Sequence, residues 1–295
     1  MILSIGEILA DMVGEKGKDE TLTFKAFVGG APFNVAVNAK QAGAKVGFVS
    51  RVGKDVIGRF CVQEAEKFGL DCLNLQQDDE RNTTIAFVTL KDGERDFAFN
   101  RHDTADYNIA FDEIDFEKYK DLNIIHLGSL MLSEDTGKAL ALEIAKKAKE
   151  LGVKLSFDLN FRTDIFGDFE RAKKAYKPYI ECADILKFSD DELRLYTGIE
   201  DIDTAIKSVA RENQLITITL GSKGSMYYYN GKKGTVSTEE KVKPVDTTGA
   251  GDAFFGTFLA NIEGKEYSEQ NIITAMEKAN KAGARATQFL GAIKL

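Results

Sequence analysis

A short run of small residues near the C-terminus opens directly into an apolar segment of helical character. The run is Gly249-Ala250-Gly251-Asp252, and Ala253-Phe254-Phe255 follows it. Such a turn exposes backbone N–H groups at the positive end of the helix dipole, where an anion is stabilised. We interpret Asp252 as a general base that accepts the proton of a hydroxyl group while its oxygen attacks a phosphoryl group. A lone Gly-x-Gly also suits a simple tight turn, with Asp252 as a favourable charge at a helix start.

Elements that could position this turn are visible along the whole chain, where short apolar, β-branched runs alternate with longer helical patterns. This alternation predicts βαβ units and a parallel sheet covered by helices. The clearest helix spans 139–151, where apolar residues repeat at helical spacing and Gly152 offers a C-terminal stop. The predicted strands are 2–5, 46–49, 122–127, 153–158, 185–188 and 215–220.

Two stretches break this alternation. Leu22 and Phe24 suggest a strand before Gly29-Gly30, and apolar residues flank the polar run 91–94 as in a hairpin. From them we expect a small β-sheet, assembled from segments 12–29 and 83–104, that serves as a lid. The chain has no fixed-period repeat and no Pro-rich linker, so we expect residues 1–295 to form a single domain with this lid inserted.

The composition excludes several classes of function. The 295 residues are 43% hydrophobic, which permits a sizeable core, and 39 basic against 47 acidic residues give a net charge of -8. Because no Lys/Arg block is present, we expect no nucleic-acid partner. No apolar run is long enough for a membrane span, and the N-terminus lacks the features of a signal peptide. Three cysteines without metal-type spacing fit reduced thiols, so we expect a cytoplasmic protein.

The two histidines are His102 and His126, and a zinc site or a Ser-His-Asp triad would need one of them. His126 lies inside an apolar run at 122–128. We therefore expect His126 to be a hydrogen-bonded imidazole in the core rather than a catalytic group.

Residues 246–254, Asp-Thr-Thr-Gly-Ala-Gly-Asp-Ala-Phe, resemble the C-terminal signature of the ribokinase-like, or PfkB, family of carbohydrate kinases. A second signature of that family, Gly-Gly followed by Ala and Asn at the head of a helix, appears at 29–36. The resemblance implies an α/β fold of three layers, with a mainly parallel central sheet flanked by helices and a small β-sheet lid. It also implies ATP-dependent phosphorylation of a sugar hydroxyl, with Mg²⁺, with Asp252 as general base and with the backbone of 249–252 as the anion hole.

The same resemblance assigns the residues that bind the sugar. Carboxylate and amide groups hold hydroxyls through directional hydrogen bonds. The stretch 99–106 resembles the Arg-x-x-x-Ala-Asp sequence of the fructokinase branch, which would bring an arginine into the pocket from the lid. The implied sugar-binding residues are Asp11, Gly29, Gly30, Asn34, Arg101, Asp106 and Arg162. Without the family, Asp11 would be a solvated residue at a strand end, and Arg101 part of an exposed ion-pair cluster with Asp103 and Asp106.

Metal-associated residues follow from two further matches. Asp158-Leu159-Asn160-Phe161-Arg162 resembles the family's Asp-x-Asn-x-Arg and follows a predicted strand, where ligands bind in parallel sheets. Asp158 could orient substrate, the waters of a Mg²⁺ ion or Arg162, and a structural loop network is the alternative. Glu192 occupies the magnesium-associated place, but Ser189 replaces the usual Asn. Because Ser189-x-x-Glu192 is also a capping box, both roles of Glu192 stay open.

Nucleotide-binding residues are implied by three more segments, of which 219–224 resembles a loop whose glycines let the backbone approach the ATP phosphates. Asn280 would line the base pocket, or it would make a helix–helix contact among small residues. The implied ATP-binding residues are Lys187, Thr219, Gly221, Gly224 and Asn280. A monovalent cation such as K⁺ would be held near Asp246, Thr248, Ala284 and Gly291.

Within the family, the stretches 101–106 and 187–190 are most similar to fructokinases. We therefore expect conversion of D-fructose to fructose 6-phosphate. The alternatives are ribokinase, 2-keto-3-deoxygluconate kinase, aminoimidazole riboside kinase or a nucleoside kinase, with Phe99 or Phe33 stacking a base. If the chain were a non-catalytic sugar-binding protein, we would expect a damaged base or anion hole. If it were a nicotinamide oxidoreductase, we would expect Gly-x-Gly-x-x-Gly after the first strand, and the sequence does not have it there. We also expect a homodimer formed through the lid.

Overall fold

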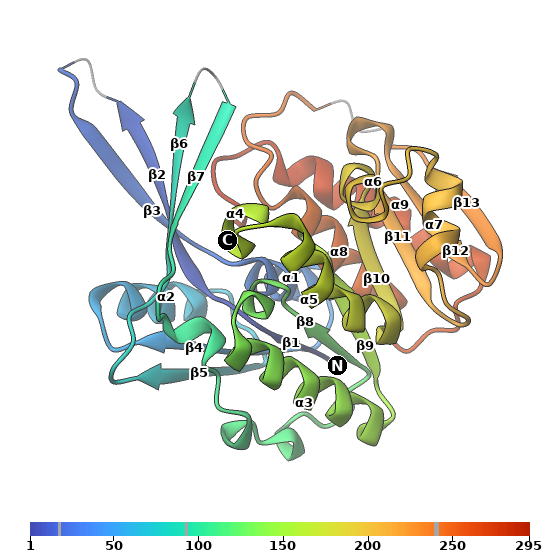
Figure 1. Ribbon diagram of the computed structural model, residues 1–295, viewed down its shortest axis with the longest axis horizontal. Coiled ribbons are helices and arrows are strands. Elements are labelled where there is room, and N and C mark those ends of the chain that lie inside the picture. The colour runs from blue at the N-terminus through green and yellow to red at the C-terminus, as the bar shows by residue number, and fades with distance from the viewer. Residues whose placement is uncertain (17–18, 92–93, 239–241) are drawn as a thin grey trace.

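A nine-stranded sheet forms the centre of the computed structural model, which describes residues 1–16, 19–91, 94–238 and 242–295 (Figure 1). Seven neighbouring strands are parallel, and the two strands at one edge are antiparallel. The six predicted strands all belong to the parallel part. The strands lie in the order β13 (Lys232–Val236), β12 (Ser225–Tyr229), β11 (Leu215–Thr219), β10 (Ile185–Ser189), β9 (Lys154–Asp158), β8 (Ile124–Leu127), β1 (Ile2–Ile5), β4 (Val46–Gly53) and β5 (Cys72–Asp78).

Helices cover both faces of this sheet, because successive side chains of each strand point to opposite faces and both sets are apolar. In β1, Ile2 lies in one core with Phe33 and Phe255, whereas Leu3 lies in the other with Ile144. The first core is closed by α1 (Ala31–Gln41), α2 (Val56–Lys67), α8 (Ala250–Ile262) and α9 (Glu269–Ala286). The second is closed by α3 (Asp135–Leu151), α4 (Thr163–Phe166), α5 (Phe169–Cys182), α6 (Asp190–Thr197) and α7 (Ile202–Val209).

A second, four-stranded sheet projects from one end of the molecule (Figure 1). Its order is β3 (Leu22–Gly29), β2 (Leu9–Lys16), β6 (Ile85–Lys91) and β7 (Glu94–Asn100). The strand β2 pairs antiparallel with β3 and parallel with β6, so two distant segments meet here. The first strand begins at Leu9, three residues before the start of the predicted segment at 12. The predicted roles of this sheet as a lid and of the chain as one domain stay predictions.

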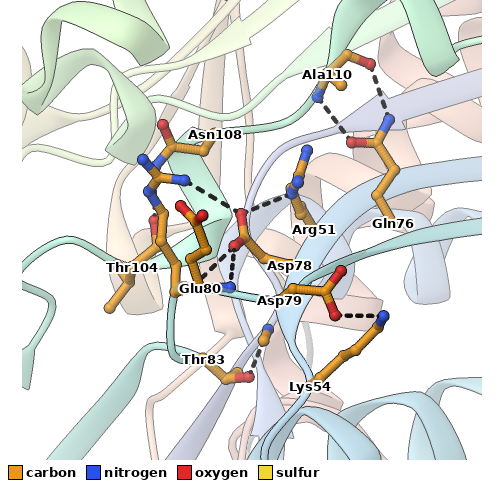
Figure 2. A network of polar contacts seen from close by, with 12 residues as sticks. Arg51, Lys54, Gln76, Asp78, Asp79, Glu80, Thr83, Thr104, Asn108 and Ala110 are labelled. Atoms are coloured by element: carbon orange, nitrogen blue, oxygen red, sulfur yellow. Dashed lines mark hydrogen bonds and ion pairs between the residues drawn. The ribbon is translucent and has the colours of Figure 1, made fainter.

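Polar contacts anchor the base of the small sheet to the end of the large one (Figure 2). The carboxylate of Asp78, the last residue of β5, accepts two backbone N–H groups of the next turn at 2.9 and 3.0 Å. It also pairs with Nε of Arg51 in β4 at 2.9 Å. Just before β6, the hydroxyl of Thr83 accepts the N–H of Gly53 at 3.0 Å. The chain therefore enters the small sheet from a fixed point.

Within the described ranges, no helix has both the length and the apolar character that crossing a membrane requires. The three cysteines are unpaired: Cys61 is buried, Cys72 is partly buried and Cys182 is exposed.

Candidate active site

A cavity of about 300 Å³ lies where the parallel strands end. Residues that follow β1, β8 and β9 line it, and the small sheet contributes Asp11 and Phe99. Many of the predicted site residues meet here, although they come from positions far apart in the sequence. These are Asp11, Gly30, Asn34, Arg162, Lys187, Thr248, Gly249, Gly251 and Asp252.

The turn before α8 has a backbone that glycine allows. Gly249 has a φ of 75°, in the left-handed region that L side chains rarely adopt. A Cβ added there would lie 2.6 Å from the Cβ of Ala292 in the C-terminal segment. Both the backbone conformation and the close approach of Ala292 therefore require a glycine.

Residues of this turn, among them Gly249 and Gly251, line the cavity at the helix start. The N–H of Ala250 donates to the carbonyl of Thr247 at 3.3 Å, at the long end of the hydrogen-bond range. Among the described residues, the N–H groups of Gly249, Gly251 and Asp252 have no acceptor. Since the positive end of the helix dipole lies at the same place, the turn is suited to an anion.

Asp252 lies in the first turn of α8 and is held by a side chain from α1. The amide Nδ2 of Asn34 donates to its Oδ2 at 2.8 Å. Burial raises the pKa of Asp252, although the hydrogen bond from Asn34 and the charges of Lys187 and Arg162 oppose the shift. A carboxylate with a raised pKa is a stronger base, so this residue can accept a proton from a hydroxyl group.

A buried ion pair lies beside the helix start. Nζ of Lys187 is 3.0 Å from Oδ2 of Asp158, and the two side chains are 7% and 5% exposed. A Cβ added to Gly251 would lie 3.0 Å from the same Nζ, so the ammonium group also adjoins the turn. Burial would lower the pKa of Lys187, but the negative charges of Asp158, Glu192 and Asp252 raise it above its usual value. Lys187 therefore keeps a positive charge next to the anion-binding turn.

Glu192 uses both carboxylate oxygens on backbone groups. Oε2 accepts the N–H of Ser189 at 2.7 Å, Oε1 accepts the N–H of Phe161 at 2.9 Å, and Oγ of Ser189 accepts the N–H of Glu192 at 3.1 Å. Burial would raise the pKa of Glu192, but Lys187 and these donors lower it below its usual value. The capping box is present, and the metal role of Glu192 stays a prediction. In the part of the chain that the structure describes, no group of three or more His, Cys, Asp or Glu could hold a metal ion by itself.

The predicted sugar-binding residues of the first 34 positions adjoin one another. A Cβ on Gly29 would lie 2.1 Å from Oδ2 of Asp11, so this glycine makes room for the carboxylate. Gly30 has a φ of 109° and is the N-cap residue of α1. Asp11 lies inside the paired part of β2 and is partly buried, so its interpretation as a solvated strand-end residue was wrong.

Arg101 and Asp106 form a buried pair next to the cavity. The Nε and Nη2 atoms of Arg101 each lie 2.8 Å from Oδ2 of Asp106, and Nη1 donates to Oγ of Ser133 at 2.6 Å. Their side chains are 3% and 1% exposed, whereas Asp103 pairs with Arg81 instead. The interpretation as one exposed cluster was therefore wrong. Arg101 lines a neighbouring cavity of about 400 Å³ that shares Phe99 with the first, and the sugar-binding roles of Arg101 and Asp106 stay predictions.

Predicted nucleotide residues gather beyond the end of β11. Nδ2 of Asn280 donates to the carbonyl of Val236 at 2.9 Å, and a Cβ on Gly224 would lie 2.2 Å from the same oxygen. Thr219 ends β11, and Gly221 follows with a φ of 58°. The amide of Asn280 therefore bonds to a strand backbone, and the ATP-binding roles of these four residues stay predictions.

Three of the four predicted cation residues are joined by one carboxylate. Asp246 accepts the N–H of Thr248 at 2.7 Å through Oδ1 and the N–H of Gly291 at 2.9 Å through Oδ2. The carbonyl of Ala284 accepts the N–H and the hydroxyl of Thr287 at 3.2 and 2.7 Å, and Thr287 in turn accepts the N–H of Asp246. This arrangement fixes the loop, and its use as a cation site stays a prediction.

A profile described as "pfkB family carbohydrate kinase" matches residues 1–295. The chain belongs to this family. Fructokinase-1 of Zea mays is 35% identical over 99% of this chain and 93% of the maize protein. A fructokinase from Xylella fastidiosa with bound ATP superposes with a TM-score of 0.88 at 28% identity, over 99% of this chain and 93% of that one. A fructokinase double mutant from Vibrio cholerae O395, with bound fructose, ADP and potassium ion, gives 0.86 at 29% identity, with coverages of 99% and 93%.

Membership of the pfkB family confirms the predicted family, the three-layer fold class and an ATP-dependent carbohydrate kinase. Residues 249–252, which a non-catalytic sugar-binding protein was expected to have lost, are all present at the cavity or beside it. His126 is 1% exposed and lies 3.2 Å from Oγ of Ser156, and burial lowers its pKa to about 3. The prediction of a core imidazole is therefore confirmed.

An ionisable cavity residue of this pfkB chain, Glu7, lies outside the sequence motifs. Glu7 is 2% exposed and lines the cavity with Asp11 and Asp252. The available signal was its position just after the first parallel strand, because ligand sites in such sheets form at the carboxyl ends of strands. A single acidic residue at that position was too weak a signal without knowledge of its burial.

Proposed function

We propose that this chain transfers the terminal phosphoryl group of ATP to D-fructose and yields fructose 6-phosphate. The observation that carries the proposal is the carboxylate of Asp252, fixed by Asn34 at 2.8 Å and standing at the start of α8 inside the cavity. The fructokinase names of its relatives, and the bound fructose of one similar structure, support this choice of sugar.

In the proposed reaction, one side of the cavity binds the sugar and the other side binds the phosphates. Asp11, Gly30 and Asn34 bind the sugar hydroxyls from the side of the small sheet and α1. The hydroxyl oxygen attacks the terminal phosphorus, the bond to the ADP oxygen breaks, and Asp252 takes the proton. The N–H groups of 249–252 stabilise the charge that develops on the transferred group. Lys187 and Arg162 add positive charge there, and closure of the small sheet excludes water.

We propose Mg²⁺ and K⁺ as the metal ions of this site. Oδ1 of Asp158 is buried and has no hydrogen-bond partner among the described residues, which suits a water of a Mg²⁺ ion. When bound, Mg²⁺ offsets the negative charge of the phosphates. For K⁺ we propose the loop around Asp246, Thr248, Ala284 and Gly291, in line with the potassium ion of the Vibrio cholerae structure.

The test is a panel of sugars incubated with the purified chain, ATP and Mg²⁺, with ADP release as the readout and phosphorus NMR of the product. We expect D-fructose to give the highest kcat/KM and a product phosphorylated at the 6-hydroxyl. A clear preference for ribose, 2-keto-3-deoxygluconate, aminoimidazole riboside or a nucleoside would replace fructose with that substrate. Turnover of none of them would contradict the kinase proposal.

We further propose that the protein works in the cytoplasm, as a homodimer. The three unpaired cysteines support a reducing compartment. An exposed apolar patch on the small sheet, made by Leu22 and Phe24, supports the dimer.

A further inference from the structure

Glu7 places a buried carboxyl group at the wall of the cavity. Its Oε1 accepts the N–H of Ala31, the first residue of α1, at 3.2 Å. Its Oε2 is buried and has no hydrogen-bond partner within the described residues. A Cβ added to Gly128 would lie 3.0 Å from this Oε2, so a glycine backbone covers it. The carboxyl group is thus enclosed by protein on one side and by the cavity on the other.

A short series of contacts joins Glu7 to the general base. A Cβ on Gly30 would lie 2.5 Å from the carbonyl oxygen of Glu7, so the turn before α1 lies directly on this residue. The carbonyl of Gly30 accepts the N–H of Asn34 at 2.8 Å, and the amide of Asn34 donates to Asp252 at 2.8 Å. Whatever fixes the first turn of α1 therefore also fixes the orientation of Asp252.

Burial and two nearby carboxylates favour the neutral form of Glu7. Three carboxylates lie near it: Asp106 after β7, Asp252 on α8 and Asp11 on β2. The positive charges nearby are those of Arg101, Arg162 and Lys187. Burial is the largest cause that raises the pKa of Glu7 to about 8. Asp106 and Asp252 add to the rise, whereas its own backbone N–H and Arg101 oppose it. A further negative charge at this place would also repel the phosphates that the cavity is proposed to bind.

We propose that Glu7 is a positioning residue, which as a neutral carboxyl group fixes the start of α1, and through Asn34 the base Asp252, without adding charge to the cavity. This inference rests on the proposed function, in which Asp252 is the base. Ionisation of Glu7 at alkaline pH then lowers turnover, because it places an unpaired negative charge beside the reacting groups.

The test compares Glu7→Gln with Glu7→Ala in steady-state kinetics from pH 6 to 9. Gln is neutral and keeps an oxygen for the N–H of Ala31, so we expect kcat within about threefold of wild type at pH 7 and loss of the alkaline fall in kcat/KM. Ala loses the contact, and misplacement of the base should lower kcat by about ten- to a hundredfold while the KM for ATP changes little. An unchanged alkaline limb in Glu7→Gln, or normal kcat in Glu7→Ala, would overturn the proposal.

Thermal unfolding supplies a readout that needs no activity. Because the folded chain keeps a proton on Glu7 that the unfolded chain releases above about pH 4.5, wild-type stability falls as pH rises toward about 8. Glu7→Gln lacks this contribution, so the difference between its melting temperature and that of wild type should become more positive from pH 6 to 8.5. If the melting temperatures of wild type and Glu7→Gln change in parallel with pH, the neutral carboxyl group of Glu7 is overturned, whether or not any sugar is phosphorylated. Inactivity of the wild type alone would count only against the proposed function.

Discussion

The carboxylate of Asp252 has two properties that a general base for a hydroxyl group requires. Its raised pKa increases its affinity for a proton, and the hydrogen bond from Asn34 fixes one oxygen. The sequence singled out Asp252 because its motif is contiguous, and its role as general base stays a prediction. The sequence could not predict the burial of the Arg101–Asp106 pair or of Glu7, since burial depends on segments that meet only in the folded chain.

Replacement of Asp252 by Asn tests the base at the residue scale. Asn has nearly the same size but cannot accept the proton, so we expect kcat to fall by about a hundred- to ten-thousandfold. Sugar affinity, measured by calorimetry, should change little. Asp191→Asn is the matched control, because Asp191 also lies in the first turn of a helix but its side chain is 93% exposed. Near-normal turnover of Asp252→Asn would remove Asp252 from this role.

At the scale of elements, the predicted strands are those whose side chains are buried on both faces. Residues 2–5 and 124–127 are fully buried, and such strands appear in the sequence as short apolar runs. The strand β13 carries Lys232 and Lys233 at an edge and is mostly exposed, so it has no such run. The bounds of edge strands therefore could not be predicted, while the central sheet and its helices could.

Gly249 provides the test of an element, the turn that begins α8. Gly249→Ala introduces a left-handed φ penalty of about 1 kcal/mol and also the contact with Ala292. We expect a lower melting temperature and a loss of kcat of about tenfold or more, because the N–H groups of the turn move. In the control Gly264→Ala, φ is 67° and no atom lies within 4 Å of the added Cβ, so only the φ penalty applies. Equal kcat in the two variants would contradict the role of the turn.

At the scale of the whole molecule, the small sheet exposes an apolar surface that a monomer leaves in water. Leu22 is 53% exposed and Phe24 is 37% exposed. They lie on the same face of β3, since they are two residues apart. Gly14 of β2 adds no side chain between them: a Cβ there would lie 3.0 Å from the ring of Phe24 and 3.4 Å from Leu22. The edge strands β3 and β7 also leave backbone groups available for pairing with another chain.

We therefore predict a homodimer in which this face of the small sheet is covered by a second copy. Sedimentation of the wild type should give twice the mass of the chain, and Leu22→Lys should give the single mass, because a buried unpaired ammonium group is unfavourable. Leu22 is the better position for this test, since Phe24 also packs on Phe87 with ring centroids 5.4 Å apart. The matched control is Leu142→Lys, where the leucine is 48% exposed and lies on α3, which covers the large sheet rather than the small one (Figure 1). That variant should stay dimeric. A monomeric wild type would contradict the dimer itself. A dimer that survives Leu22→Lys but not Leu142→Lys would place the interface on another face.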